Sequence, residues 1–217
     1  MYKLNVLTLF IAFFFIPTAS LLSQISLTAS SGTATGTFTT ISAAFAAINA
    51  GTHTGNIVIS VNGNTTVPAT PVYLDASSLT TASYTSVLIK PTIIATISGA
   101  PNAGSAVVNF NGSDNVTIDG SVTNGGATKD LTISNTNAAT ILNTACIRLL
   151  GWTTGGMGVT NMVIKNNIII GNTPGNNGTS GSTNTTSYGI YAGSNTLTSM
   201  SSTTAGANYD NITVEIN

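Results

Sequence analysis

The stretch Gly104–Gly120, GSAVVNFNGSDNVTIDG, constrains the fold of this chain more than any other. It holds two short segments, Val108-Asn-Phe and Val116-Thr-Ile, in which apolar and polar residues alternate. Alternation with a period of two indicates half-buried strands. The Asn-Gly and Asp-Gly pairs after the segments tolerate the positive φ angles of sharp turns. The stretch therefore predicts two short strands joined by a tight corner.

Both segments return later in the chain. Copies of the second segment share Asn or Asp, an apolar residue, an outward residue and then Ile or Val, and they begin at Asn115, Asp130, Asn161 and Asn211. Copies of the first segment begin at Val108, Ile147 and Ile190. The paired copies lie roughly 40 to 50 residues apart, which is typical of repeat architectures. Asn-Gly between two strands is also a hairpin signal, but a hairpin does not explain the recurrence.

A solenoid explains the recurrence, because each coil lays its strands on the equivalent strands of the coil before it. Ile and Val then stack inside, Thr lines the outside, and a buried stack of corner Asn side chains bonds along the axis. We therefore predict an all-β fold, a right-handed parallel β-helix. The alternative is an immunoglobulin-type β-sandwich with strands at 8–12-residue spacing. A sandwich would not repeat Asn-x-Thr-Ile at the same point of each unit.

One amphipathic helix is predicted ahead of the repeated strands. Its apolar residues follow the i, i+3, i+4, i+7 rule and are Ile41, Ala44, Phe45 and Ile48. Thr39 or Thr40 is the expected N-cap, and Gly51 follows the end. Since a solenoid exposes its core at the first coil, we expect this helix to cap the N-terminal end. The preceding stretch, Ile25–Thr37, is expected to be irregular.

The first, less regular coils are predicted from four apolar segments, namely Ile57–Val61, Val72–Leu74, Val87–Ile89 and Ile94–Ile97. Two insertions, Gly171–Ser187 and Thr198–Tyr209, are rich in Gly, Ser, Thr and Asn. Such stretches are expected to be loops that hang from corners of the coil.

Residues 1–23 have the pattern of a secretory signal peptide. Lys3 precedes the apolar run Leu7–Ile16, Pro17 ends it, and small residues follow. No later stretch approaches the roughly 20 apolar residues of a membrane span. The β-helix domain is therefore expected to cover residues 24–217 and to be secreted or displayed at the cell surface. Because the sequence stops at a corner of its fourth Asn-x-Thr-Val copy, we expect this domain to be truncated at its C-terminal end.

Composition excludes some functions. Charged residues are 5% of the chain, against roughly 25% in an average soluble domain. A net charge of −1 and an aromatic content of 6% argue against nucleic-acid binding by phosphate neutralisation or base stacking. The one cysteine, Cys146, excludes an intrachain disulfide and is expected to be a small buried residue.

The chain resembles the pectate-lyase-like right-handed parallel β-helix repeat proteins that bacteria secrete or display. The resemblance is carried by TTISAAFAAINAG, SYTSVLIKP, and FNGSDNVTIDG with its later copies, and it covers nearly all of the chain after residue 23. It implies the fold more specifically than the function, because the fold serves lyases, hydrolases, adhesins and repeat segments of surface proteins.

Enzymes of this fold class are expected to cluster carboxylates around a polysaccharide, as acid/base pairs or with Ca²⁺ beside a basic residue. The acids of this chain are dispersed along it and are Asp75, Asp114, Asp119, Asp130, Asp210 and Glu215. Several lie at corners, where Asp is favoured for its turn chemistry. The Asp-Asp, Gly-His-Gly and Arg-x-Lys signatures of polygalacturonase-like hydrolases are absent from the sequence. His53 is expected to be a solvated loop residue, and no catalytic residue, metal ligand or cofactor is predicted.

Aligning the copies predicts two columns of outward side chains. Asn109, Arg148 and Tyr191 would offer an amide, a guanidinium and an aromatic ring about 4.8 Å apart, which suits contact with a sugar. We take these three residues as the candidate ligand-binding site. Asp119, Lys165 and Glu215 would form a stabilising charge ladder on the next face, worth a few tenths of a kcal/mol per exposed pair.

These observations favour a structural, adhesive or glycan-binding β-helical segment of a larger secreted or surface protein. Its expected partner is an extracellular polysaccharide or a cell-surface glycan. The alternative is a polysaccharide lyase or glycoside hydrolase whose active site lies beyond, or only partly within, this chain. An enzyme would need three or more acids or bases in one cleft, which is the feature that separates the two functions.

Overall fold

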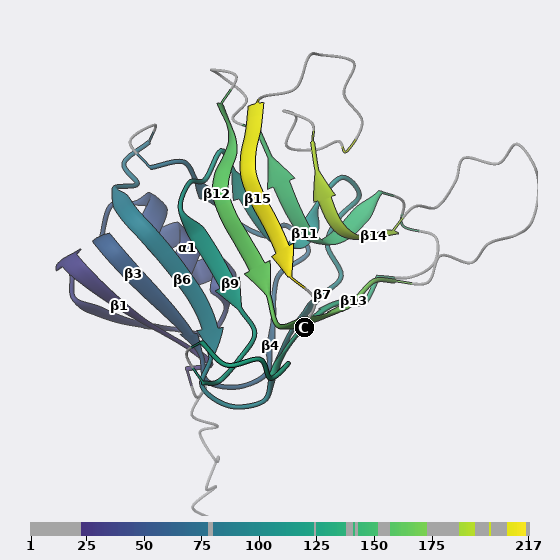
Figure 1. Cartoon of the computed structure of the whole chain (residues 1–217), viewed down its shortest axis with the longest axis horizontal. Helices are drawn as coiled ribbons and strands as arrows, with labels where there is room; N and C mark the ends of the chain where they lie inside the picture. The colour runs from purple at the N-terminus through teal and green to yellow at the C-terminus, as the bar shows by residue number, and fades with distance from the viewer. Residues whose placement is uncertain are drawn as a thin grey trace, which may run out of the picture.

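A computed structural model describes residues 23–77, 80–123, 125–137, 141, 143–151, 157–172, 187–193, 200 and 208–215 of the 217-residue chain (Figure 1). The proposed signal peptide lies almost entirely outside the described residues, and so do most residues of the two predicted insertions. In the described part, one helix and fifteen strands follow one another. No helix in that part is long and apolar enough to cross a membrane.

The strands form three sheets, which we name A, B and C. Sheet A has the order β15-β12-β9-β6-β3-β1-β2 and comprises β1 (Ile25–Gly32), β2 (Thr35–Phe38), β3 (His53–Val61), β6 (Tyr84–Pro91), β9 (Val116–Asp119), β12 (Met157–Lys165) and β15 (Asn208–Glu215). Sheet B comprises β4 (Thr65–Thr66), β7 (Ala95–Gly99), β10 (Leu131–Asn135) and β13 (Asn167–Ile170). Sheet C comprises β5 (Tyr73–Asp75), β8 (Ala106–Asn111), β11 (Thr144–Leu150) and β14 (Ser187–Ala192).

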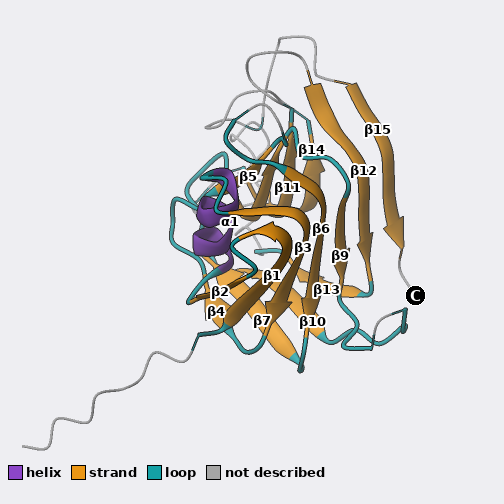
Figure 2. Ribbon diagram, turned by 90° about the vertical axis from the view of Figure 1, so that its left-hand side faces the viewer, coloured by secondary structure: helices purple, strands orange, loops and turns teal. Residues whose placement is uncertain are grey.

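From β3 onward the chain visits sheets A, B and C in turn, and each strand pairs in parallel with the strand three places later (Figure 2). Among the strands that the structure describes, antiparallel pairing is confined to β1 with β3 and β2 with β1. The prediction of an all-β fold with parallel sheets is confirmed. Each of the four apolar segments predicted as early strands overlaps a strand, although Val72 and Ile94 lie just before β5 and β7, and the two-residue β4 was not predicted.

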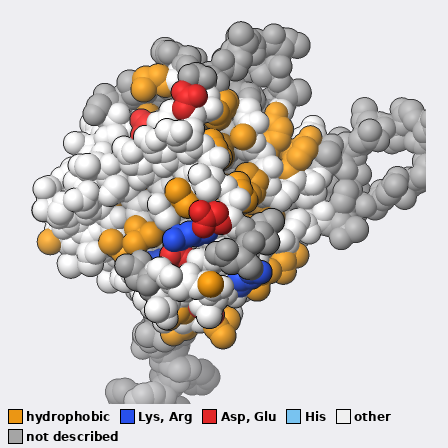
Figure 3. Space-filling model, viewed as in Figure 1, with side chains coloured by type: hydrophobic (Ala, Val, Ile, Leu, Met, Phe, Trp, Pro, Cys, Tyr) orange, Lys and Arg blue, Asp and Glu red, His pale blue; other side chains and the backbone are white. Residues whose placement is uncertain are grey.

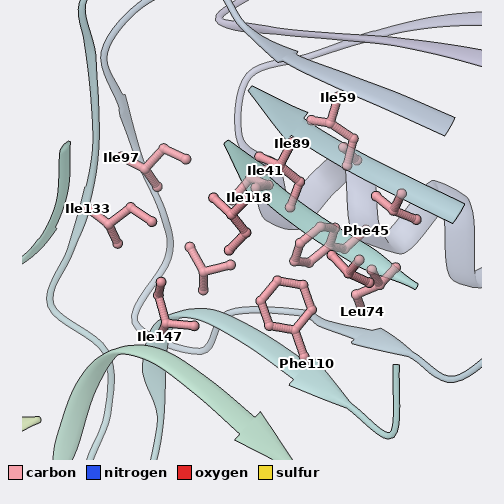
Figure 4. Close-up of a cluster of buried hydrophobic side chains, with 14 of the residues drawn as sticks. Ile41, Phe45, Ile59, Leu74, Ile89, Ile97, Phe110, Ile118, Ile133 and Ile147 are labelled. Atoms are coloured by element: carbon pink, nitrogen blue, oxygen red, sulfur yellow. The ribbon is translucent and has the colours of Figure 1, made fainter. Parts of the chain in front are cut away.

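The core lies between the three sheets, and equivalent residues of successive strands stack in register (Figure 4). Ile59, Ile89 and Ile118 are neighbours in sheet A. Ile97 pairs with Ile133 in sheet B, and sheet C contributes further residues such as Phe110. All of these side chains are 1% exposed or less. Each contributes roughly 1.5–3 kcal/mol by its burial, so the stacked aliphatic rows hold the sheets together.

Helix α1 (Ile41–Asn49) confirms the predicted helix. Thr40 is the N-cap, and its hydroxyl accepts a hydrogen bond from the Ala43 N–H at 3.2 Å. The ring of Phe45 packs against that of Phe110 with the centroids 5.9 Å apart.

The C-terminal end of the helix contacts β5, the edge strand of sheet C. Asn49 Nδ2 donates to the Tyr73 carbonyl at 2.7 Å, and Asn49 Oδ1 accepts from the Asp75 N–H at 3.0 Å. The helix therefore covers the core, and its Asn49 side chain satisfies backbone groups of β5, as a neighbouring strand would.

The stretch Ile25–Thr37, expected to be irregular, is instead a hairpin formed by β1 and most of β2. Ile25 and Leu27 are 0% and 1% exposed, so the alternation ISL does place apolar side chains in the core. Gly32 has a φ of 71° beside the turn between the strands, a conformation that glycine adopts without strain.

The four copies that begin with Asn or Asp do not all stack. Those that begin at Asn115, Asn161 and Asn211 lie in sheet A, whereas the copy at Asp130 leads into β10 of sheet B. The three asparagines have φ angles of 56°, 51° and 53° and bond along the row, Nδ2 to Oδ1, at 3.1 and 3.0 Å. The predicted bonding of corner asparagines is confirmed. The expectation of a buried stack is wrong, because all three are exposed.

Candidate functional site

The predicted column of Asn109, Arg148 and Tyr191 is present on neighbouring strands of sheet C. Arg148 is in register with Asn109 on one side and with Tyr191 on the other. Tyr73 of β5 extends the column, because it is in register with Asn109. The sequence did not reveal this fourth member, since the segment around Tyr73 lacks the Gly corner by which the later copies were aligned.

The burial of the column differs from the expectation of a solvent-facing strip. Asn109 and Arg148 are both 0% exposed, whereas Tyr73 and Tyr191 are half-buried. A second apolar cluster explains part of this burial. It consists of Ala106, Ala145 and Met200, with Tyr188 and Tyr191 packed against it. The middle of the column is therefore interior, and only its tyrosine ends reach the surface.

Asn109 binds its own strand. Its Oδ1 accepts from the Ala106 N–H at 3.0 Å, and its Nδ2 donates to the Ala106 carbonyl at 2.6 Å. Ser105 Oγ also lies within 3.4 Å of the same Oδ1. Because both ends of the amide are occupied by groups within four residues, Asn109 fixes the start of β8.

Arg148 bonds to groups from two other segments. Its Nη1 donates to Tyr73 Oη at 3.1 Å and to the Gly104 carbonyl. Burial lowers the pKa of the guanidinium, and the nearby hydroxyls of Tyr73, Tyr191 and Tyr209 act in the opposite direction. Burial also raises the pKa of Tyr191 and that of Tyr209. Arg148 therefore lies near three tyrosines, and its bond to Tyr73 links β11 to β5, two strands away in sheet C.

The open part of this site is a cavity beside Tyr73. Its volume is about 340 Å³, and it is lined by Ala69, Thr70, Pro71, Tyr73, Asn102, Ala103 and Ser105. Asn102 Nδ2 donates to Thr70 Oγ1 at 2.9 Å across the rim. The cavity offers one aromatic ring, hydroxyls and an amide. The residues between β4 and β5 that line it carry no motif, so the cavity could not be predicted from the sequence.

A second cavity, of about 380 Å³, lies where β12 to β15 come together. It is lined by Ile164, Asn167, Ile169, Gly189, Ile190, Val214 and Glu215. Its wall is mainly aliphatic, and Ile164 belongs to the main core. This cavity is therefore continuous with the packing between the sheets and does not present a set of convergent polar groups.

The register of the predicted charge ladder is confirmed in sheet A, but the expectation of exposed pairs is wrong for Asp119, which is buried. Lys165 is in register with Asp119 and with Glu215. Lys165 Nζ lies 3.5 Å from Asp119 Oδ2. Asp119 is 2% exposed, and its Oδ1 accepts from the Ser121 N–H at 3.1 Å and from Asn166 Nδ2 at 2.9 Å. The acid is thus held by the backbone of its own corner and by Asn166, which follows the neighbouring strand β12, and the lysine reaches it from the surface.

His53 is not the solvated loop residue that the sequence suggested. It begins β3 and is 3% exposed. Its Nδ1 lies 2.6 Å from the Thr33 carbonyl, which can only accept, so Nδ1 carries the proton of this bond. The ring of Phe38 meets its ring edge-on at 6.0 Å. The β1–β2 hairpin, which was not predicted, is what covers it.

Cys146 is buried as expected, and burial raises the pKa of its thiol to about 11. Its Sγ donates to the Ile170 carbonyl at 3.0 Å. Burial also raises the pKa of Asp75, and the Asn111 amide partly offsets this. Among the residues that the structure describes, no group of three His, Cys, Asp or Glu side chains is placed to hold a metal ion.

Comparison of the chain with protein-family models, with curated proteins and with solved structures finds no match. What the site binds is therefore inferred from its chemistry. That chemistry consists of a half-exposed tyrosine, a buried arginine behind it and a polar rim.

Proposed function

We propose that this chain is a right-handed parallel β-helix that acts as a structural or adhesive, glycan-binding segment of a secreted or surface-displayed protein. The cyclic order of the strands supports the fold, because three parallel sheets visited in turn are what successive coils would produce. Right-handedness follows the general rule for parallel crossovers, which are right-handed in about 98% of cases.

The cavity beside Tyr73 is the observation that carries the binding function. A half-buried tyrosine presents a rigid apolar face, against which the C–H face of a sugar ring packs. Thr70, Asn102 and Ser105 supply donors and acceptors for sugar hydroxyls at its rim. A volume of about 340 Å³ is near the lower end of the range of ligand pockets, and it suits one or two sugar rings.

Arg148 contributes by holding the aromatic platform in place. Its bond to Tyr73 Oη at 3.1 Å fixes the ring from behind, and a ring that is already ordered loses less entropy when a ligand stacks on it. The ligand favoured by this chemistry is a neutral polysaccharide, since the rim of the cavity is formed by uncharged residues.

Glycan-array screening of the full chain, followed by calorimetry with the best ligand, tests the proposal. Tyr73→Ala is expected to weaken binding about tenfold or more, because it removes the stacking face. Tyr73→Phe keeps the ring but loses the bond from Arg148, so it should bind less tightly than the unmodified chain and more tightly than Tyr73→Ala. Tyr191→Ala is the matched control, because Tyr191 lies in the same column but does not line the cavity.

Two results would contradict this assignment. If no glycan binds, the binding function is wrong. If Tyr191→Ala loses binding while Tyr73→Ala does not, the ligand contacts the other end of the column. Circular dichroism of each variant shows whether the fold is retained, so that a loss of binding can be assigned to the site.

A further inference from the structure

The two ends of the stack of sheets differ in how they are covered. Among the described strands, β15, β13 and β14 are the last strands of sheets A, B and C, and each pairs on one side only. They lie on the side of the molecule away from helix α1 (Figure 1). At the opposite end, α1 covers the core and Asn49 satisfies backbone groups of β5. The free strand edges are therefore gathered at one end.

An inward-facing aliphatic row of sheet A shows that this end is open. Its members are in register and are Ile59, Ile89, Ile118, Ile164 and Val214. The first four are 2% exposed or less, whereas Val214 on β15 is 48% exposed. The cavity of about 380 Å³ lies against Val214 and against Ile169 and Ile190 of the last strands of sheets B and C. Figure 3 shows hydrophobic side chains at the surface over β14 and β15.

Two polar rows of sheet A also end on β15. In the corner row each asparagine donates its Nδ2 to the Oδ1 of the asparagine before it, so Asn211 Oδ1 is the acceptor at the end of the row. In the charge row Lys165 lies 3.5 Å from Asp119, and no ion pair of Glu215 is found within the described part of the chain. A further strand would continue these rows with an amide donor and a basic side chain.

The rows together specify the sequence that fits beside β15. It begins with Asn, continues with an aliphatic residue beside Ile212 and an outward residue beside Thr213, and ends with an aliphatic residue beside Val214 and a basic residue beside Glu215. The stretch 161–165 of β12, Asn-Met-Val-Ile-Lys, has this pattern and pairs in this register with the other edge of β15. The occupied edge of β15 thus shows what its free edge would accept.

We propose that the free edge of β15, with the cavity beside it, docks an extended strand of a partner polypeptide that carries the pattern Asn-aliphatic-x-aliphatic-Lys or Arg. Backbone hydrogen bonds along the edge supply the affinity, while the cavity and Glu215 select the side chains. The strand runs parallel to β15, because an antiparallel strand would place its Asn and its basic residue at the wrong ends of the rows.

A second copy of the chain does not supply this strand. In the described part, the strands that share the Asn-aliphatic-x-aliphatic pattern in sheet A are β9 and β12, which are paired on both sides, and β15 itself. Two β15 edges related by a two-fold axis either run antiparallel or turn their inner faces to opposite sides. Neither arrangement continues the rows, so the occupant is a strand of another polypeptide.

Fluorescence anisotropy with a labelled peptide, TNMVIKNN, which is the sequence of residues 160–167, tests the proposal on the full chain in the form recovered after expression. We expect saturable binding with a Kd of about 100 μM or tighter. The reversed peptide NNKIVMNT has the same composition and should bind at least about tenfold more weakly, because it cannot continue the rows in parallel. Val214→Asn should weaken binding about tenfold, since it places an amide at the cavity. Thr213→Asn is the matched control, because Thr213 lies on the same strand and does not line the cavity.

A charge exchange tests the register of the docked strand. Glu215→Lys should weaken binding of TNMVIKNN about fivefold at low salt, because attraction is replaced by repulsion. The same variant should regain affinity for the peptide TNMVIENN, in which Glu stands in place of Lys. This exchange remains decisive if circular dichroism shows that Val214→Asn alters the fold.

Four results would overturn the proposal. They are the absence of saturable binding up to about 1 mM peptide, equal affinity for the reversed peptide, equal loss in Thr213→Asn and Val214→Asn, and no recovery in the charge exchange. Sedimentation velocity of the chain alone should show a monomer. A dimer that the peptide dissociates would identify a second copy as the occupant, and the assignment to a partner strand would then be wrong.

Discussion

Arg148 and Lys165 occupy similar positions in two consecutive strands and behave differently. Each is a basic residue in the middle of an in-register column of parallel strands, Arg148 in sheet C and Lys165 in sheet A. Arg148 is 0% exposed and bonds to Tyr73 and to the Gly104 carbonyl. The side chain of Lys165 is 27% exposed and reaches Asp119 from the surface.

The difference comes from what lies over each sheet. The outer side of sheet C carries the cluster of Ala106, Ala145 and Met200, with two tyrosines packed on it. The outer side chains of sheet A stay half-buried or exposed along β3, β6 and β12. A covered face turns a column of polar side chains into a structural element, whereas an open face leaves it available for contact with another molecule. Of the sheet C column, only the two tyrosine ends, Tyr73 and Tyr191, reach the surface.

Removing the two basic side chains should give the largest difference. Arg148→Ala is expected to lower the free energy of unfolding by about 3 kcal/mol, because it leaves a buried cavity and strips partners from a buried carbonyl. Lys165→Ala should cost about 0.5 kcal/mol, because the lysine is partly exposed and Asp119 keeps its bonds from Ser121 and Asn166. Urea denaturation followed by circular dichroism measures both. Equal losses would show that the two faces are covered alike.

A pair of asparagines extends the same comparison to uncharged groups. Asn109→Ala should cost about 2 kcal/mol, since it leaves the buried N–H and carbonyl of Ala106 without their side-chain partner. Asn161→Gly removes both bonds of the exposed asparagine row of sheet A but keeps the positive φ, and because these groups are open to water it should cost about 0.5–1 kcal/mol. The same denaturation measurement separates them. A larger loss for Asn161→Gly would mean that the exposed row holds the sheet.

The register of both columns could be predicted because it depends on local patterns. The segments that begin at Val108 and Ile147 carry the same alternation and the same corner, so aligning them also aligns Asn109 with Arg148. Helix α1 could be predicted for the same reason, since its spacing and its Thr40 cap are local. The copy at Asp130 shows the limit of this approach, because a similar local pattern serves sheet B.

Burial could not be predicted, because it depends on segments far away in the sequence. Met200 packs near Ala145 from more than 50 residues away, and nothing in its sequence context indicates that contact. His53 was misjudged in the same way, since Thr and Gly flank it and the β1–β2 hairpin that covers it was expected to be irregular. The Tyr73 cavity was missed because its lining residues come from separate connections between strands.

The smallest effect should be the change in the stability of the fold with pH that results from the ionisation of two aspartates, Asp75 and Asp130. Burial raises the pKa of Asp75, at the end of β5, above 3.8. Asp130, before β10, has a lowered pKa, because the Thr128 hydroxyl and the Val122 N–H donate to its carboxylate. Protonated Asp75 therefore stabilises the fold below pH 3.8, and this contribution is lost as the pH rises through its raised pKa. Ionised Asp130 stabilises the fold above pH 3.8, and this contribution is lost as the pH falls through its lowered pKa.

The stabilities of Asp75→Asn and Asp130→Asn should therefore differ from that of the unmodified chain in opposite directions as the pH rises. Asp75→Asn stays neutral at every pH, so its stability relative to the unmodified chain should rise as the pH increases through the raised pKa and then level off. Asp130→Asn should be less stable at neutral pH, and its deficit should vanish in acid. Urea midpoints between pH 2 and pH 7 measure both trends. If the stability of Asp75→Asn relative to the unmodified chain did not rise with pH, the β5 end of sheet C would be open to water. The contrast between the covered face of sheet C and the open face of sheet A would then not extend to β5.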